Sequence, residues 1–309
     1  MIKKGNELNF ADKKMSLIIQ GSPGVGKTTI AQSAPKVLTI DADNGMCRVK
    51  PQHRQDASIC TTFDEVKADI EAAKGQYETI VIDTCGALIE YMKDWAMRTD
   101  PKASKKDGGF SLQGYGVIKS EFIRLSAELR KKFNVIFLFH ENMTKQDESV
   151  FYELVVEGSA RTLVYQPADL AAHLFIQNGR RYLGFTPTEQ YSAKSAYGIK
   201  GIIEVPELKE GDPNDFLTKL FAKVRSNLDT ESKALAPEKQ KYDAAMAEAR
   251  NLVNMIEKPE DVGECVKIIK QLDHALTSEK EATALLKARL AELKIVWDKS
   301  AKAYKYAES

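Results

Sequence analysis

The stretch GSPGVGKTTIAQS, from Gly21 to Ser33, constrains the fold of this chain more than any other segment. A short apolar run at 16–20 precedes it, and a second apolar run at 36–40 follows it. Glycines allow the backbone to curl until several N–H groups point at one phosphate group. A glycine-rich loop between a strand and a helix therefore predicts a phosphate-binding site.

Within this stretch, the residues from Gly21 to Thr28 match the pattern G-x-x-x-x-G-K-[ST] in full. The lysine of this pattern, here Lys27, places its charge on the β- and γ-phosphates of a nucleotide, and the hydroxyl of Thr28 binds Mg²⁺. We therefore expect ATP and Mg²⁺ to bind here. The predicted nucleotide-binding residues are Gly21, Ser22, Pro23, Gly24, Val25, Gly26, Lys27, Thr28 and Thr29.

Short apolar runs rich in branched residues recur along the first half of the chain, with helical patterns between them. Such runs are typical of strands that are buried on both faces of a parallel sheet. Alternating strands and helices favour an open α/β sheet. The apolar spacing over 115–132 predicts one of the helices. The predicted strands are 16–20, 37–40, 78–83 and 134–140.

The sequence pattern in the middle of the chain predicts antiparallel strands at the end of this sheet. Asn178-Gly179 is a signal for a two-residue hairpin turn. Strand-like runs lie on both sides of this turn and again further along, at 170–177, 181–186 and 201–205. The predicted fold class is therefore an α/β P-loop fold with a mainly parallel central sheet and antiparallel strands at its end.

The last part of the chain predicts a separate helical module. Beyond Asn227 there are few β-formers and many Ala, Glu, Lys and Leu residues. The patterns predict helices at 239–256, 259–274 and 278–307. We thus expect an N-terminal segment at 1–14, an ATPase core at 15–227 and a helical docking or oligomerisation module at 228–309.

Composition and charge limit the classes of protein to which the chain can belong. It has 309 residues, of which 43% are hydrophobic, so it can bury a sizeable core. Its net charge of +1 means that any contact with nucleic acid must come from a local patch. No run approaches the roughly 18 apolar residues of a membrane span. With four cysteines in no metal-type spacing and no secretory signal, we expect a reduced, cytosolic protein without a membrane partner.

Polar residues at the ends of the predicted strands are the candidates for chemistry. Asp83 ends a buried strand and, together with Thr28, would hold the Mg²⁺ shell. Asp43 and Glu141 follow the second and fourth strands, and His140 lies at the tip of the fourth. Because the carboxyl ends of parallel strands converge on the ligand crevice, we expect a carboxylate there to polarise water and the imidazole to contact the γ-phosphate.

The order of these motifs resembles the RecA-like P-loop ATPases, and more closely the phage-type nucleotide-binding proteins that act as single-strand annealing recombinases. Besides the phosphate loop, the resemblance rests on Leu38 to Asp43, Thr79 to Thr84 and Phe137 to His140, and it covers about residues 15–205. It implies that Lys27, Asp43, Glu141 and His140 are the catalytic residues. The family's acid is commonly Glu, so the shorter Asp43 implies that hydrolysis is slow or that Glu141 does this work. The resemblance also implies that DNA stimulates hydrolysis.

The resemblance also implies two DNA-binding loops. One matches the interval 99–114, which is basic and glycine-rich, and the other matches 142–161, which carries more acidic residues. A basic loop with an aromatic side chain is suited to stacking and phosphate contacts. The residues implied to bind single-stranded DNA are Lys102, Lys105, Lys106 and Phe110 in the first interval and Lys145 and Arg161 in the second.

The family also assembles, and a cation from a neighbouring subunit completes each nucleotide site. The candidates for this trans-acting cation are Arg180, Arg181 and Lys194. The expected partners are therefore single-stranded DNA, further copies of the chain in a ring or filament, and a single-strand-binding protein. The implied compartment is cytoplasmic, which for a phage-encoded protein is the cytoplasm of the bacterial host.

Three other functions fit the same phosphate loop. An AAA-type motor or helicase loader would use the helical module to dock a protein partner. A small-molecule P-loop kinase would need a lid with several arginines, and the interval 99–114 contains none. An ATP-binding annealing scaffold with negligible turnover is the third, and the aspartate at position 43 leaves it open.

Overall fold

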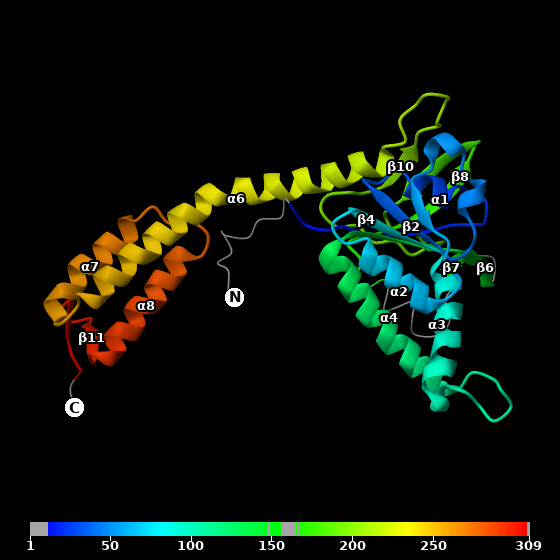
Figure 1. Ribbon diagram of the computed structural model, residues 1–309. Coiled ribbons are helices and arrows are strands. Elements are labelled where there is room, and N and C mark those ends of the chain that lie inside the picture. Colours follow the sequence, from blue (N-terminus) through cyan, green and yellow to red (C-terminus); the bar gives the residue numbers. More distant parts are fainter. Residues whose placement is uncertain (1–11, 147–148, 156–164, 166, 308–309) are drawn as a thin grey trace. The chain divides into compact units, whose positions relative to one another are not determined.

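The computed structural model describes residues 12–146, 149–155, 165 and 167–307 (Figure 1). The chain divides into two compact units, a larger one that ends at Asn227 and a smaller one that begins at Leu228. All predicted nucleotide-site residues belong to the larger unit. None of the helices in the described residues is long and apolar enough to span a membrane.

An eight-stranded sheet forms the centre of the larger unit. Its strand order is β10-β9-β8-β1-β5-β4-β2-β3, with parallel pairing from β8 to β3 and antiparallel pairing of β8, β9 and β10. This confirms the predicted α/β fold. The strands are β1 (Ser16–Gln20), β2 (Val37–Asp41), β3 (Asp56–Ser58), β4 (Thr79–Asp83), β5 (Asn134–Phe139), β8 (Leu170–Gln177), β9 (Arg180–Gly184) and β10 (Ile202–Val205).

The strand order determines where the functional residues meet. Every residue of β1, β2, β4 and β5 is buried, as the apolar runs predict. Strand β5 lies between β1 and β4, and its register pairs Phe139 with Gln20 and Phe137 with Ile82. The carboxyl ends of these strands therefore line up at one edge, so the segments that follow β1, β4 and β5 are neighbours in space.

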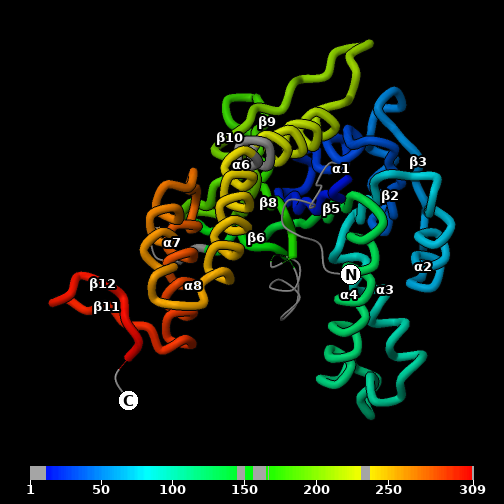
Figure 2. The backbone as a smooth tube through the Cα atoms, turned by 90° about the vertical axis from the view of Figure 1, so that its left-hand side faces the viewer, coloured from blue at the N-terminus to red at the C-terminus, as the bar shows by residue number. Residues whose placement is uncertain are grey.

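Helices cover both faces of the sheet. Figures 1 and 2 show α2 (Phe63–Ala72), α3 (Cys85–Thr99) and α4 (Leu112–Lys132) together on one face. The opposite face is covered by α1 (Lys27–Ala31) and by the first turns of α6 (Phe216–Asn254). The backbone of α6 is fixed to the segment after α1, because the Leu217 N–H donates to Ser33 Oγ at 3.0 Å.

Three strands in the described part of the larger unit have no counterpart among the predicted strands. The short edge strand β3 is one. The other two are β6 (Glu141–Gln146) and β7 (Ser149–Leu154), which form a separate two-stranded hairpin directly after β5. Polar residues interrupt the apolar alternation of this hairpin, so its pattern resembles a loop.

The smaller unit contains the rest of α6 together with α7 (Pro259–Gln271) and α8 (Ser278–Glu292). These helices enclose a second core that includes Met246, Val253, Val262 and Ile269. The prediction of one helix over 278–307 is wrong, since α8 ends at Glu292 and a hairpin follows. The hairpin consists of β11 (Ile295–Asp298) and β12 (Ala303–Tyr306). Lys294, at φ 55°, takes the left-handed conformation that stops the helix.

The start of α6 also differs from the prediction. The prediction begins a helix at 239, two residues after Pro237, and proline normally interrupts a helix. In the structure α6 begins at Phe216 and continues past Pro237. Its first turns bury Leu217, Phe221 and Val224, which share one helical face. Burial of this face stabilises the first turns of α6, so the helix begins earlier than predicted.

Replacement of Phe221 tests this packing. Phe221 is fully buried, so Phe221→Ala should lower the free energy of unfolding by about 3–5 kcal/mol. Urea denaturation followed by circular dichroism would measure the loss. The exposed neighbour offers a control, and Lys223→Ala should change stability by less than about 0.5 kcal/mol. Equal unfolding midpoints for the two variants would contradict the assigned position of α6.

Candidate functional site

The phosphate loop, residues 21–28, is held tightly against the sheet. The Gly21 N–H donates to the Phe139 carbonyl at 3.3 Å, and a Cβ added at Gly21 would lie 2.6 Å from the Leu174 carbonyl oxygen. Gly24 and Gly26 have φ angles of 78° and 106°. Only glycine adopts these conformations without strain, so the glycines of the motif allow both the close approach and the curl of the loop.

Lys27 lies at the centre of this loop and is only 6% exposed. Its Nζ donates to the carbonyl oxygens of Gly21 at 2.8 Å and Ser22 at 3.0 Å, and it lies 3.3 Å from His140 Nδ1. Burial lowers the pKa of Lys27 below its ordinary value, and the nearby carboxylates oppose that shift. The ammonium group is therefore desolvated and fixed in position, as a cation that neutralises phosphate charge must be.

Thr28 and Asp83 form the second part of the site. Thr28 Oγ1 donates to Asp83 Oδ2 at 2.6 Å, so the hydroxyl of α1 and the carboxylate at the end of β4 point at one place. Burial raises the pKa of the Asp83 carboxyl, the Thr28 hydrogen bond opposes the rise, and Asp41 and Asp43 add to it. Two hard oxygen donors among several carboxylates are a fitting partial ligand set for Mg²⁺, which takes its other ligands from phosphate and water. Thr28 and Asp83 are the residues that would hold the ion.

The segment after β2 brings two aspartates to the site in different ways. Asp41 is buried, and its carboxylate accepts hydrogen bonds from the Gly45 N–H at 2.6 Å and the Met46 N–H at 3.0 Å. These bonds hold the turn. Asp43 is about one-third exposed, and its Oδ2 lies 3.4 Å from His140 Nε2. Of the two, Asp43 has the accessible carboxylate, as the prediction requires of a catalytic acid.

His140 connects the predicted catalytic groups. One ring nitrogen lies 3.3 Å from Lys27 Nζ, and the other lies 3.4 Å from Asp43 Oδ2. The imidazole is at the end of β5, between the phosphate loop and the segment after β2. A group in this position contacts both the cation for the γ-phosphate and the predicted acid. The structure thus brings Lys27, Asp43 and His140 together.

Glu141 faces a different set of partners. Its Oε1 accepts a hydrogen bond from Ser22 Oγ at 2.8 Å, and its Oε2 lies 2.9 Å from His173 Nε2. Both side chains are buried, at 3% and 5% exposed, and this close pair lacks the alignment of a hydrogen bond. His173 is a site residue that the sequence analysis left unassigned. Its ring lies among Tyr152, Phe175 and Tyr191, with centroids 4.4–5.5 Å away.

The three cations predicted to act on a neighbouring subunit lie in different surroundings. Arg181 contacts the phosphate loop of its own chain, because its Nε donates to the Val25 carbonyl at 2.9 Å and packs on Gly26. Arg180 is exposed and pairs with Glu204. Lys194 pairs through its backbone with Ala171 on β8. Of the three, Arg181 lines the same pocket as Lys27.

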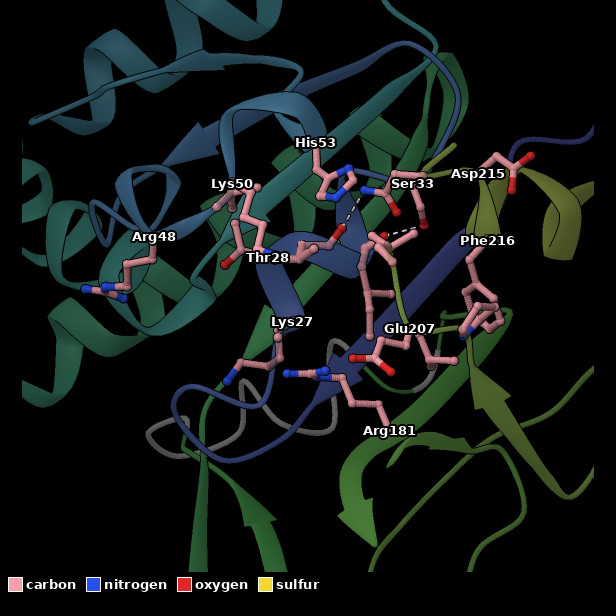
Figure 3. Close-up of a pocket in the computed structure, with 18 of the residues that line it drawn as sticks. Lys27, Thr28, Ser33, Arg48, Lys50, His53, Arg181, Glu207, Asp215 and Phe216 are labelled. Carbon is pink, nitrogen blue, oxygen red and sulfur yellow. Dashed lines mark hydrogen bonds between the residues drawn. The ribbon is translucent and has the colours of Figure 1, made fainter. Parts of the chain in front are cut away.

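A pocket of about 540 Å³ extends from the phosphate loop to the segment 205–216 that follows β10. Figure 3 shows Lys27 and Arg181 reaching toward each other in it, with Asp215 and Phe216 away from them. The far wall of the pocket mixes apolar side chains, such as Leu208 and Phe216, with carboxylates, such as Glu207 and Asp215. Asn214 Nδ2 donates to the Thr29 carbonyl at 3.1 Å. The volume suits a nucleotide. No local motif marks 205–216, so sequence patterns do not identify this wall.

The predicted DNA-binding residues of the interval 99–114 lie apart from the pocket. Lys102, Lys105 and Lys106 are exposed between α3 and α4, at the end of these helices away from the sheet (Figure 1). Phe110 packs edge-to-face on Tyr115, with ring centroids 4.9 Å apart, and contacts the core. Phe110 is therefore engaged in packing. Lys145 lies in β6, and Arg161 falls outside the described residues.

The chain is similar to one protein family over most of the larger unit. The model of a family described as AAA domain matches residues 13–197. None of the curated proteins compared with this chain matches it.

Two solved structures show weak likeness. An ATPase from the type III secretion system of pathogenic bacteria is 12% identical, with a TM-score of 0.35 over 89% of this chain and 81% of that one. The flagellar accessory protein FlaH from Methanocaldococcus jannaschii is also 12% identical, with a TM-score of 0.29 over 62% of this chain and 90% of that one. Neither likeness is strong enough to bear on activity.

Removal of the central cation tests the site. Lys27→Ala should abolish ATP binding, because no other side chain in the described part of the chain places a buried ammonium against the loop carbonyls. Titration with a fluorescent ATP analogue in the presence of Mg²⁺ would measure this. Lys223→Ala, at an exposed residue that does not line the pocket, should bind as the parent does. Unchanged affinity in Lys27→Ala would show that nucleotide binds elsewhere.

Proposed function

Because the chain belongs to the AAA domain family, we propose that it hydrolyses Mg-ATP and uses the nucleotide state to control its hold on single-stranded DNA, as a recombination or annealing protein. The observation that carries the proposal is the position of His140. Its imidazole contacts Lys27 and Asp43, and the next residue begins the β6–β7 hairpin. A γ-phosphate bound at Lys27 would thus contact His140, and the β6–β7 hairpin begins at the next residue.

Hydrolysis would use the groups at the edge of the sheet in separate roles. Lys27 would neutralise charge on the β- and γ-phosphates, and Thr28 with Asp83 would hold Mg²⁺, which would supply further positive charge there. Asp43 orients the attacking water, because its carboxylate is accessible and beside His140. The short Asp43 side chain and its contact with His140 favour slow turnover. Glu141 is less suited to this role, since Ser22 and His173 already engage it.

Arg181 is suited to complete the charge around the phosphates. Its guanidinium is anchored through Nε to the Val25 carbonyl, and it lines the pocket beside Lys27 (Figure 3). We propose that it stabilises the transition-state charge in its own chain. Arg180 and Lys194 remain the candidates for a contribution from a neighbouring subunit in a ring or filament.

The response to nucleotide would travel through the β6–β7 hairpin. Ser22 of the phosphate loop bonds to Glu141, the first residue of β6, and Glu141 contacts His173 on β8. The hairpin is also tied to the core sheet region by the Tyr152 N–H, which donates to the Gln190 carbonyl at 2.7 Å. A shift of the loop on phosphate binding therefore changes the hairpin's contacts, which is an order–disorder or rigid-body switch.

The basic loop between α3 and α4 is the proposed contact for the DNA backbone. It lies at the far end of the 15-residue helix α3, which rises about 22 Å from the Asp83 edge of the sheet. DNA bound there would not touch the nucleotide. Coupling between the two sites would depend on α3, which begins at Cys85, two residues beyond Asp83.

ATPase measurements with and without single-stranded DNA test the proposal. We expect the oligonucleotide to stimulate hydrolysis and ATP to tighten oligonucleotide binding, because coupling between two ligands is reciprocal. Mobility shifts with ATP, ADP and no nucleotide would measure the second effect. An ATPase indifferent to single-stranded DNA but stimulated by a protein partner would favour the AAA-type motor or helicase loader instead.

Charge removal in the basic loop tests the DNA surface. Replacing Lys102, Lys105 and Lys106 by Ala should weaken oligonucleotide binding and lower its salt slope by roughly 2, at about 0.7 per phosphate contact on a single strand. The control removes the same charge elsewhere, at the exposed residues Lys131, Lys200 and Lys223. Equal salt slopes in the two triple variants would remove the loop from the binding surface.

A further inference from the structure

The C-terminal hairpin, β11 with β12, presents aromatic side chains to solvent. Its register pairs Ile295 with Tyr306 and Trp297 with Tyr304, so these four side chains share one face. Ile295 is 4% exposed and belongs to the core of the smaller unit, which anchors that face. Trp297 and Tyr306 are 50% and 54% exposed. Trp297 packs edge-to-face with Tyr304, with ring centroids 4.8 Å apart, and the rest of its surface is open to solvent.

The same hairpin is surrounded by positive charge. The connection between the strands begins with Lys299 and ends with Lys302, and both side chains are exposed. Between residues 287 and 307 there are six Lys or Arg residues and two Asp or Glu residues, although the chain as a whole is almost neutral. One of the two acids, Asp298, accepts hydrogen bonds from the Ser300 and Ala301 N–H groups and pairs with Lys305. The basic character of the hairpin is therefore local.

Asp298 also holds the connection in one conformation. The Lys305 hydrogen bond and the two backbone N–H groups lower the pKa of the Asp298 carboxyl to about 2. The carboxylate is thus ionised at neutral pH and fixes the turn that carries Lys299 and Lys302. The lysines are then presented beside Trp297 from an ordered turn.

We propose that this hairpin binds a single-stranded nucleic acid, with a base stacked on Trp297 and the backbone phosphates beside Lys299 and Lys302. Accessible aromatic faces next to lysines are the arrangement that binds single strands without sequence preference. The inference gives the DNA-binding ATPase proposed above a second contact, outside the ATPase unit. It rests on that proposal only for the identity of the strand.

Charge and ring exposure together favour a polynucleotide over a protein partner. An acidic polypeptide would satisfy the lysines but would leave Trp297 and Tyr306 without a planar partner. An apolar protein surface would cover the rings but would leave lysines at its centre, whereas protein interfaces are depleted of Lys. A nucleotide chain offers a flat base and a phosphate in each repeating unit, so it satisfies both features at once.

Tryptophan fluorescence tests the proposal directly, because the chain has only Trp95 and Trp297. In the full-length variant Trp95→Phe, all tryptophan emission comes from the hairpin. Titration with oligo-dT without ATP should quench this emission in a saturable and salt-sensitive way, since stacked bases quench indole. Absence of quenching while the same oligonucleotide binds by mobility shift would overturn the proposal, and so would quenching by poly-glutamate but not by oligo-dT.

Affinity measurements on hairpin variants give a second, independent reading. Trp297→Ala should weaken oligo-dT binding by about tenfold or more, and Trp297→Phe should restore part of it. Val296→Ala is the matched control, because Val296 is 43% exposed on the other face of the hairpin and its loss should leave affinity unchanged. Equal losses in Trp297→Ala and Val296→Ala would also overturn the proposal.

The outcomes separate this inference from the function of the ATPase unit. Quenching at Trp297 with an ATPase that ignores DNA would keep the hairpin site and reject the coupled ATPase. DNA-stimulated ATPase with normal affinity in Trp297→Ala would do the reverse.

Discussion

The close contact between the phosphate loop and the ends of β5 and β8 is the constraint on which the site depends. Gly21 bonds to the last carbonyl of β5 and has no room for a Cβ against β8. The loop therefore begins in the middle of the sheet with a strand on either side. Since β5 separates β1 from β4, His140 and Asp83 approach the loop from one direction, and Arg181 on β9 approaches from the other. This packing contact thus places the phosphate loop among His140, Asp83 and Arg181.

This arrangement also sets the energetic terms of nucleotide binding. The carbonyls of Gly21 and Ser22 satisfy the buried ammonium of Lys27, and burial still lowers its pKa. A desolvated cation interacts more strongly with a polyanion than a hydrated one does, because less water must be removed on binding. Lys27 already loses its water shell when the chain folds, so nucleotide binding does not have to remove that water. On binding, charged phosphate oxygens can replace the neutral carbonyl oxygens as partners of the ammonium group.

Sequence predicts those features of the structure that depend on a short, local pattern of residues. The phosphate loop, the buried strands and Asp83 could be predicted because each depends on a short pattern. The register of β5 beside β1 and β4 brings Lys27, Asp43 and His140 together, and the strand-end argument anticipates it. His173 and the pocket wall at 205–216 could not be predicted, since their roles arise from distant pairing. The helix expected over 278–307 fails for a related reason, because the hairpin that replaces its end is stabilised by packing of Ile295 on α7 and α8.

Two consecutive residues, His140 and Glu141, connect the pocket to the rest of the larger unit through different partners. His140 contacts Lys27 and Asp43, whereas Glu141 contacts Ser22 and His173. A displacement of the end of β5 therefore changes both sets of contacts at once. The Glu141–His173 pair is close and buried, so separating the two side chains would leave buried polar groups without partners, at a cost in free energy. Because one backbone segment carries both residues, a shift of His140 would be passed on to Glu141 and to the β6–β7 hairpin that begins there.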